Sequence, residues 1–303
     1  MSDDLDIQLA GEVTWRNYSR LGYERLTRGV YGRAPQLDGL DRWEVRRVKF
    51  LSHVRAVMTA YQGRDVVLYG PTAMQILGVA LPARLQDWDT CHILVLRGSY
   101  RPLRQGVCAH WTTEPWDVWD LRDGIPVLHP VDHWLQLTGT DDELIEVADG
   151  LMRRHHPLIS LDEFHRRLDA LAGRPGVQRG RRLMKWVVPG TDSLYETRTR
   201  LVLVRAGLPV PAVNLPVRCY NGFTYHVDMG YEVEKVAVEF DGQVHVGDKR
   251  QMEIDAARRN DIQGEGWFMI TVTAQMLEHP VDLVRTVEAA LVMRRAALAS
   301  KLS

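Results

Sequence analysis

The chain has 303 residues, of which 45% are hydrophobic and 25% are charged, and its formal net charge is −1. A chain of this length and composition is expected to form a globular protein of two domains or three small ones. Because the net charge is close to zero, any contact with nucleic acid must come from local basic patches rather than from an overall basic surface.

The three cysteines, Cys91, Cys108 and Cys219, are far apart in the sequence. Their number and spacing fit neither a disulfide framework nor a zinc knuckle, which is typical of a protein from a reducing cytoplasm. The acidic start has no hydrophobic signal core, and no apolar run approaches the roughly 18 residues of a membrane span. We therefore expect a cytoplasmic protein without a membrane partner.

Residues 1 to about 35 are expected to form short helices followed by a hairpin. The segment LTRGVYGR at 26–33 is basic and is interrupted by glycines, which is typical either of the wing of a winged helix or of any tight surface hairpin. A helix is predicted within 43–61, because apolar residues recur there at helical spacing, namely Val45, Val48, Leu51, Val54 and Met58.

Residues 66–175 are expected to form an α+β region in which the apolar runs HILVLRG, GVCAHWTT and GIPVLHP predict short strands. The tryptophans here could stack on bases, although large aromatic residues usually belong to a core. His129 and His133 lie four residues apart, a spacing that suits a metal pair. With no third ligand in view, a structural role is the favoured interpretation.

Residues 173–189 are rich in Gly, Pro and Arg and contain no acidic residue. They predict a basic linker, with the boundary between two domains near 175–190. A charged run is usually a solvated linker, but beside a nuclease site it would also neutralise DNA phosphates. The candidate phosphate contacts in this stretch are Arg179, Arg181, Arg182 and Lys185.

The stretch YHVDMGYEVEKVAVEFDGQVH at 225–245 concentrates carboxylates within predicted strands. Alternation places Glu239 and Asp241 on one face and Phe240 with its neighbouring valines on the other. A four-residue turn then places Asp228 opposite Glu239, with Cβ atoms about 5 Å apart. Three converging carboxylates predict a hard-oxygen site for Mg²⁺, and an exposed hairpin with solvated acids is the alternative.

Several ordered motifs support the first interpretation. They are SLYETRTR at 193–200, RAGLPVPAVNLPV at 205–217, HVD ending at Asp228, VAVEFDGQVH at 236–245, DAARRNDI at 255–262 and GWFMITVT at 266–273. In these motifs the last third of the chain resembles the Vsr-like (very-short-patch-repair-like) domains of the PD-(D/E)XK, restriction-endonuclease-like superfamily. The resemblance implies an α/β fold, with a mixed sheet flanked by helices over 190–303.

The same resemblance implies a metal-dependent endodeoxyribonuclease that uses Mg²⁺, for which Mn²⁺ can substitute. It assigns Asp228, Glu239 and Asp241 to the metal and to catalysis. The usual Asp/Glu-x-Lys motif has Asp241 in place of the lysine. Vsr-type enzymes also lack that lysine and use a histidine, a role that His245 would fill as general acid or base.

Three further candidate site residues have two interpretations each. Glu196 stands three residues after Ser193, which is the spacing of a capping box, but in PD-(D/E)XK folds a glutamate of the first helix often reaches towards the metal site. Arg258 or Arg259 either belongs to a solvent-facing ladder of ion pairs with Asp255, or binds the scissile phosphate as the resemblance implies.

The first half of the chain resembles the N-terminal winged-helix module of AbiEi-type (type IV toxin–antitoxin) antitoxins, which often precedes a Vsr-like domain in actinobacterial proteins. This resemblance implies a winged helix over 1–65, an AbiEi-like region over 66–175, and Arg28 and Arg33 as DNA phosphate contacts. The main prediction is therefore a DNA endonuclease of repair or phage defence, and a homodimer that cuts both strands is compatible with it. A non-catalytic DNA-binding regulator or antitoxin, and a module that binds a toxin or another protein, are the alternatives.

Overall fold

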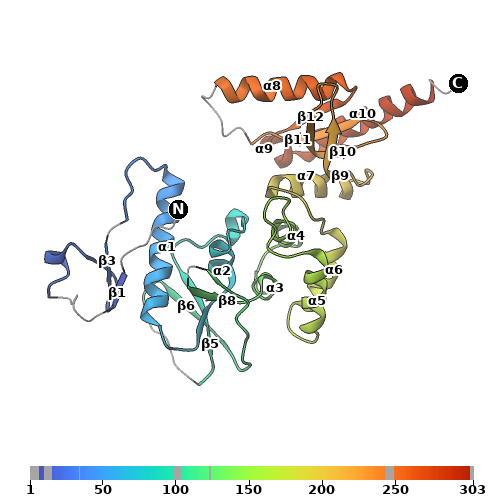
Figure 1. Cartoon of the computed structure of the whole chain (residues 1–303). Coiled ribbons are helices and arrows are strands. Elements are labelled where there is room, and N and C mark those ends of the chain that lie inside the picture. The colour runs from blue at the N-terminus through green and yellow to red at the C-terminus, as the bar shows by residue number, and fades with distance from the viewer. Residues whose placement is uncertain are drawn as a thin grey trace. The chain divides into compact units, whose positions relative to one another are not determined.

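The computed structural model describes residues 7–9, 16–33, 35–98, 104–122, 124–242 and 249–300. The chain forms two compact units, Met1–Gly139 and Thr140–Ser303, each built from helices and small sheets (Figure 1). The expected mixed α/β class is therefore confirmed. No helix in the described ranges is long and apolar enough to cross a membrane.

The N-terminal unit contains one sheet with the strand order β1-β3-β2, a second with the order β4-β5-β6, and the pair β7-β8. Its elements are β1 (Ile7–Leu9), η1 (Ser19–Leu21), β2 (Glu24–Thr27), β3 (Val30–Gly32), α1 (Arg42–Ala60), β4 (Val66–Leu68), α2 (Gly70–Ile76), η2 (Ala83–Leu85), β5 (Cys91–Leu96), β6 (Val107–Thr112), β7 (Asp120–Arg122), β8 (Ile125–Val127) and α3 (Pro130–Trp134). The antiparallel pair β2-β3 is the hairpin predicted at 26–33.

Helix α1 begins where local chemistry predicts it, because Asp41 caps the N–H groups of Trp43 and Glu44, both at 2.8 Å. Its inward face differs from the predicted one. Of the predicted apolar positions only Val54 is fully buried, and the buried residues are Phe50, Ser52, Val54, Ala56 and Val57. The helix packs against strands on two sides of it, β1 to β3 and β5, so its buried face is wider than a single stripe.

The C-terminal unit is organised around one four-stranded sheet with the order β12-β11-β10-β9, in which only the pair β11-β12 is parallel. Its elements are α4 (Asp141–Leu151), α5 (Leu161–Ala170), α6 (Val177–Leu183), η3 (Met184–Trp186), α7 (Leu194–Arg205), β9 (Ala212–Arg218), β10 (Thr224–Tyr231), β11 (Val236–Phe240), α8 (Lys249–Gly264), β12 (Phe268–Val272), α9 (Ala274–Glu278) and α10 (Pro280–Ala299).

Helices cover both faces of this sheet (Figure 1). On one face Val236, Val238 and Ile270 pack with residues of α7 and α10, and on the other Ala237 packs with Ile262 of α8. The predicted alternation along β11 is thereby confirmed for its valines. Helix α8 lies between the parallel strands β11 and β12 in the sequence, as a crossover connection requires.

Strand β10 is irregular at Asp228. Val227 packs in the cluster on the α8 side, whereas Met229, two residues later, packs in the cluster on the α7 side. Residues two apart on a regular strand share a face, so the faces exchange at Asp228. The register places Asp228 next to Asn214 of β9, whose φ of 55° is in the left-handed region.

The predicted basic linker at 173–189 is part of the packed C-terminal unit. It forms α6 and η3, and Val177, Leu183 and Met184 are buried. The division between the two units lies at Gly139 and Thr140, earlier than the boundary predicted near 175–190. Composition was misleading here because the arginines face outward while the apolar residues between them pack inward.

Candidate functional site

Asp228 lies where β10, β11 and α7 approach one another. Its Oδ2 accepts a hydrogen bond of 2.9 Å from the N–H of Phe240. Burial, together with the nearby charges of Glu196 and Glu239, raises the pKa of Asp228 to about 7. This carboxyl group is therefore close to its titration midpoint at neutral pH.

Glu239 is held by Arg258 of α8. The Nη1 of Arg258 donates to Oε2 of Glu239 at 3.2 Å and its Nη2 donates to Oε1 at 2.5 Å. The same Nη2 also donates to the carbonyl of His226 at 2.6 Å. Between the two arginines that the resemblance offered, Arg258 reaches the carboxylates, whereas Arg259 is exposed. Arg258 therefore supplies positive charge at the site and links α8 to β10 and β11.

For Glu196 the structure shows one half of the predicted capping box. Ser193 caps α7 by accepting a hydrogen bond from the N–H of Glu196 at 3.2 Å, and Glu196 accepts one from the N–H of Asp192 at 2.9 Å. Burial raises the pKa of Glu196. Its charge is also the largest of the nearby charges that raise the pKa of Asp228, so Glu196, in the first turn of α7, belongs to the same electrostatic site.

The remaining predicted site residues are placed differently. The N–H of Asp241 donates to the carbonyl of Val272 at 2.8 Å, which extends the parallel pairing of β11 with β12, and Asp241 is exposed. His245 lies outside the described residues. Within the described ranges, Asp228, Glu239 and Asp241 do not form a group whose ligand atoms all lie within 4.8 Å of one another.

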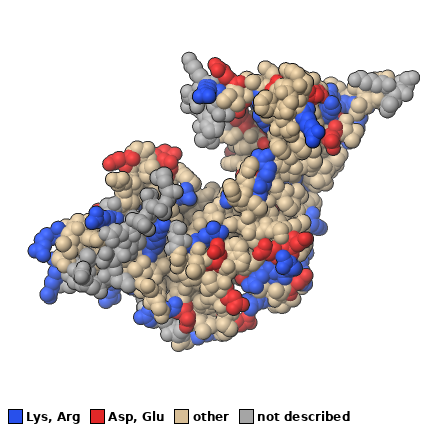
Figure 2. Space-filling view, viewed as in Figure 1, with Lys and Arg blue, Asp and Glu red and all other residues tan. Residues whose placement is uncertain are grey.

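The predicted phosphate contacts of the basic stretch are divided between paired and exposed side chains. Arg179 donates to Asp141 and Arg181 donates to Asp169, each at 2.8 Å. Arg182 is exposed, and the Nζ of Lys185 lies 5.5 Å from the ring centroid of Trp186. On the face shown in Figure 2, basic and acidic side chains are interspersed rather than gathered into one basic surface.

The two arginines predicted in the β2-β3 hairpin are both exposed. Arg28 lies at the turn, and its carbonyl accepts a hydrogen bond from Arg104. The guanidinium of Arg33 lies 5.8 Å from the ring centroid of Tyr23. Both side chains are thus at the surface, where contact with a phosphate is sterically allowed.

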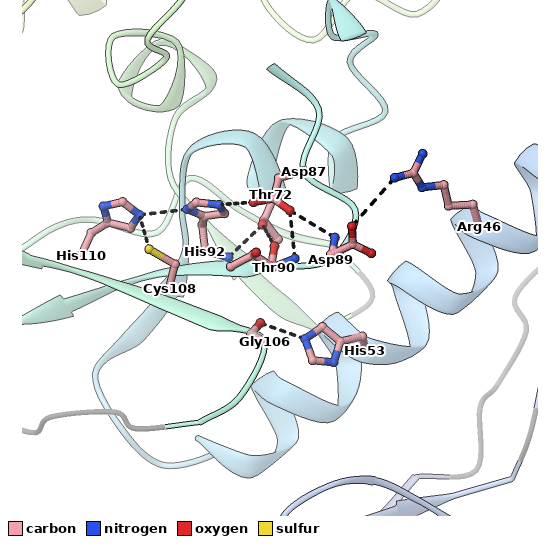
Figure 3. A network of polar contacts seen from close by, with 10 residues as sticks. All are labelled: Arg46, His53, Thr72, Asp87, Asp89, Thr90, His92, Gly106, Cys108 and His110. Atoms are coloured by element: carbon pink, nitrogen blue, oxygen red, sulfur yellow. Dashed lines mark hydrogen bonds and ion pairs between the residues drawn. The ribbon is translucent and has the colours of Figure 1, made fainter. Parts of the chain in front are cut away.

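The structure also brings together a polar group in the N-terminal unit that was not predicted from the sequence. His92, Cys108 and His110 place one nitrogen or sulfur atom each within 4.8 Å of the other two (Figure 3). His92 and His110 also line a cavity of about 310 Å³, together with Tyr69 and Asp87. The available signal was the Cys-x-His spacing within GVCAHWTT, since residues two apart on a strand share a face.

The two histidines that the sequence did single out have structural roles. Nδ1 of His129 accepts a hydrogen bond of 3.2 Å from the N–H of Val131 and thereby caps α3. His133 is completely buried, and burial lowers its pKa to about 3. His133 is therefore neutral at physiological pH and belongs to the core of the unit, as the favoured interpretation predicted.

No family model matches this chain. It is similar to the uncharacterized proteins MT2308 and Rv2248 of Mycobacterium tuberculosis, from strains CDC 1551 / Oshkosh and ATCC 25618 / H37Rv. Each is 28% identical over 140 residues, which cover 42% of this chain and 51% of the relative. The chain thus spans about half the length of these curated relatives. Among solved structures, the RV2827C protein of Mycobacterium tuberculosis is 19% identical, with a TM-score of 0.37 over 56% of this chain and 63% of that one.

Proposed function

We propose that the C-terminal unit is a Mg²⁺-dependent endonuclease that hydrolyses phosphodiester bonds in DNA. The observation that carries the proposal is the environment of Asp228, a largely buried carboxyl group beside Glu196 and Glu239 whose pKa is raised to about 7. Crowded, buried carboxylates destabilise a fold, and strongly shifted pKa values are concentrated at functional sites. A divalent cation would relieve this repulsion.

The donor set fits the proposed ion, because Mg²⁺ prefers oxygen ligands and binds through one or two protein carboxylates together with substrate phosphate oxygens. Asp228 and Glu239 would hold it, with Asp241 and His245 assigned to the site by the resemblance to Vsr-like domains. When bound, Mg²⁺ would neutralise the phosphate and acidify a water molecule. The mixed sheet with helices on both faces supports a restriction-endonuclease-like fold for this unit.

The proposal is tested with the purified full chain and supercoiled, linear, mismatched or single-stranded DNA, in Mg²⁺, Mn²⁺ or EDTA. We expect metal-dependent cleavage that falls at least about 100-fold in Asp228→Asn, since loss of one group that acts on the transition state costs on the order of 10²–10³ in rate. The matched control is Asp282→Asn on α10, because the side chain of Asp282 is 86% exposed. Equal cleavage by both variants would contradict the proposal.

A non-catalytic DNA-binding regulator or antitoxin is the second candidate. It is favoured by the bidentate pairing of Arg258 with Glu239, which neutralises one of the proposed metal ligands internally, and by Asp241 at the position of the usual lysine. If the protein is such a regulator, no DNA substrate is cut in the presence of Mg²⁺ or Mn²⁺. Binding of DNA would then be sensitive to salt but equal in EDTA and Mg²⁺, and unchanged in Asp228→Asn.

A further inference from the structure

The pairing of β5 with β6 places three side chains with metal-binding atoms on one face of the N-terminal unit's second sheet. The strands are parallel, and their register sets His92 directly opposite Cys108. His110 follows Cys108 by two residues on β6 and therefore shares its face. The backbone therefore directs all three side chains to the same face of the sheet, and Figure 3 shows them pointing towards one another.

The distances within this group match those between zinc ligands. Nδ1 of His92 lies 3.0 Å from Nε2 of His110, and Sγ of Cys108 lies 3.6 Å from the same nitrogen. In a tetrahedral zinc site, with Zn–N of about 2.05 Å and Zn–S of about 2.3 Å, adjacent ligand atoms are separated by about 3.3 Å for two nitrogens and by about 3.6 Å for nitrogen and sulfur. These two separations thus lie within a few tenths of an ångström of those in a zinc site, and all three ligand atoms lie within 4.8 Å of one another.

The ring of His92 is held as metal-binding histidines usually are. Its second nitrogen, Nε2, lies 3.0 Å from Oδ2 of Asp87. The other carboxylate oxygen of Asp87 accepts hydrogen bonds from the N–H groups of Asp89 at 3.1 Å and Thr90 at 2.9 Å. A carboxylate on the outer nitrogen fixes the tautomer of a ligating histidine and increases its basicity. Here the carboxylate is itself held in place by backbone donors.

The group also borders an accessible space. His92 and His110 line the cavity of about 310 Å³, and the side chain of His92 is 16% exposed. The ring of Tyr69, which lines the same cavity, lies with its centroid 4.8 Å from that of His110. Three protein ligands with a position open to a cavity are typical of zinc sites that bind water or a substrate, whereas structural zinc sites have four protein ligands.

We propose that His92, Cys108 and His110 bind one Zn²⁺ ion, with Asp87 as the positioning carboxylate of His92 and with the fourth coordination position facing the cavity. Two imidazoles and one thiolate form a nitrogen and sulfur donor set that favours Zn²⁺ over Mg²⁺, which prefers oxygen. This site is separate from the carboxylates around Asp228, and it does not depend on the function proposed for the C-terminal unit.

The test uses the metal-free full chain, titrated with Co²⁺ as a spectroscopic substitute for Zn²⁺ and then with Zn²⁺. We expect one Co²⁺ per chain, a thiolate-to-cobalt charge-transfer band, the intense visible bands of tetrahedral cobalt, and displacement by one equivalent of Zn²⁺. Failure to bind either ion would overturn the proposal.

Two cysteines of the same unit provide a matched pair of variants. Cys108→Ala should abolish the charge-transfer band. Cys91→Ala, which alters the residue next to His92 on the opposite face of β5, should retain it. Retention of the band in Cys108→Ala, or its loss only in Cys91→Ala, would contradict the assignment. Circular dichroism of the metal-free variants verifies that both are folded.

The remaining variants separate the roles within the group. His110→Gln should reduce Zn²⁺ affinity more than Asp87→Asn does, because loss of an outer carboxylate usually costs about 10- to 100-fold in metal affinity. Asp87→Asn should keep the cobalt charge-transfer band, since the thiolate remains a ligand. Asp228→Asn should leave Co²⁺ binding unchanged. If Asp228→Asn instead abolishes binding while Cys108→Ala does not, the metal belongs to the C-terminal carboxylates and the proposal fails.

Discussion

Arg200 of α7 and Asp149 of α4 form an ion pair of 2.7 Å whose two side chains are only 2% and 0% exposed. Asp149 also accepts hydrogen bonds from the N–H of Val188 at 2.7 Å and from the hydroxyl of Thr197 at 2.9 Å. These contacts join the SLYETRTR segment to α4. Part of that motif therefore stabilises the unit rather than forming the site around Asp228.

Removal of one partner of this pair should strongly destabilise the C-terminal unit. Arg200→Met leaves Asp149 buried without its cation, which typically costs about 3–5 kcal/mol. Arg205→Met is the matched control on the same helix, because the pair of Arg205 with Asp142 is 41% and 42% exposed and should contribute no more than about 1 kcal/mol. Urea denaturation measures both changes, and equal losses would contradict the assigned role.

The charge of Asp228 should make stability depend on pH. Its pKa in the folded chain is about 7, above the ordinary value of 3.8, so the ionised form is disfavoured by the fold. The resulting loss of stability begins as the pH rises above about 4 and is complete above about 7. Asp228→Asn removes this cost of ionising a buried carboxyl group. The substitution should stabilise the unit by roughly 1–3 kcal/mol at pH 8 and by less at pH 5, because one pKa unit corresponds to about 1.4 kcal/mol. Melting temperatures at the two pH values measure this difference, and a larger gain at pH 5 would contradict it.

Arg258 should be necessary for stability in the absence of a divalent cation. Arg258→Met leaves Glu239, whose side chain is 12% exposed, beside Asp228 without a counter-charge, at an expected cost of roughly 1–3 kcal/mol. Arg259→Met at the adjacent exposed position should change stability by less than about 0.5 kcal/mol.

Mg²⁺ should raise the melting temperature of Arg258→Met more than that of the unaltered chain, because the ion replaces the missing positive charge. Thermal unfolding with Mg²⁺ or EDTA measures the effect. Equal shifts would argue against a metal at these carboxylates, although the stability loss itself would remain explained by the ion pair.

DNA binding should distinguish the paired from the exposed residues of the basic stretch. Arg182→Ala and Lys185→Ala should each reduce the slope of log affinity against log salt by up to about 0.9, if each side chain contacts one phosphate. Arg179→Ala and Arg181→Ala should have smaller effects, because Asp141 and Asp169 already neutralise these arginines. Fluorescence anisotropy at several salt concentrations measures the slopes. An identical effect of all four changes would contradict this division.

Local sequence was sufficient for several elements of the C-terminal sheet. The turn between β10 and β11, the alternation along β11 and the helix before β12 follow from residue periodicity and turn chemistry, which act over a few residues. The position of Glu196 near the start of α7 follows in the same way, since Ser193 caps the helix locally.

Only the tertiary structure decided which of these residues meet. Pairing of Arg258 with Glu239 requires α8 to fold back onto the sheet, and the irregularity at Asp228 lies beside Asn214 of the neighbouring strand. Arg179 and Arg181 appeared to belong to a linker because their acidic partners lie in other helices. His92 and Cys108 are brought together by the register of two parallel strands. Sequence periodicity determines the face that a residue occupies on its own element, whereas the partner across that face depends on register and packing between distant segments.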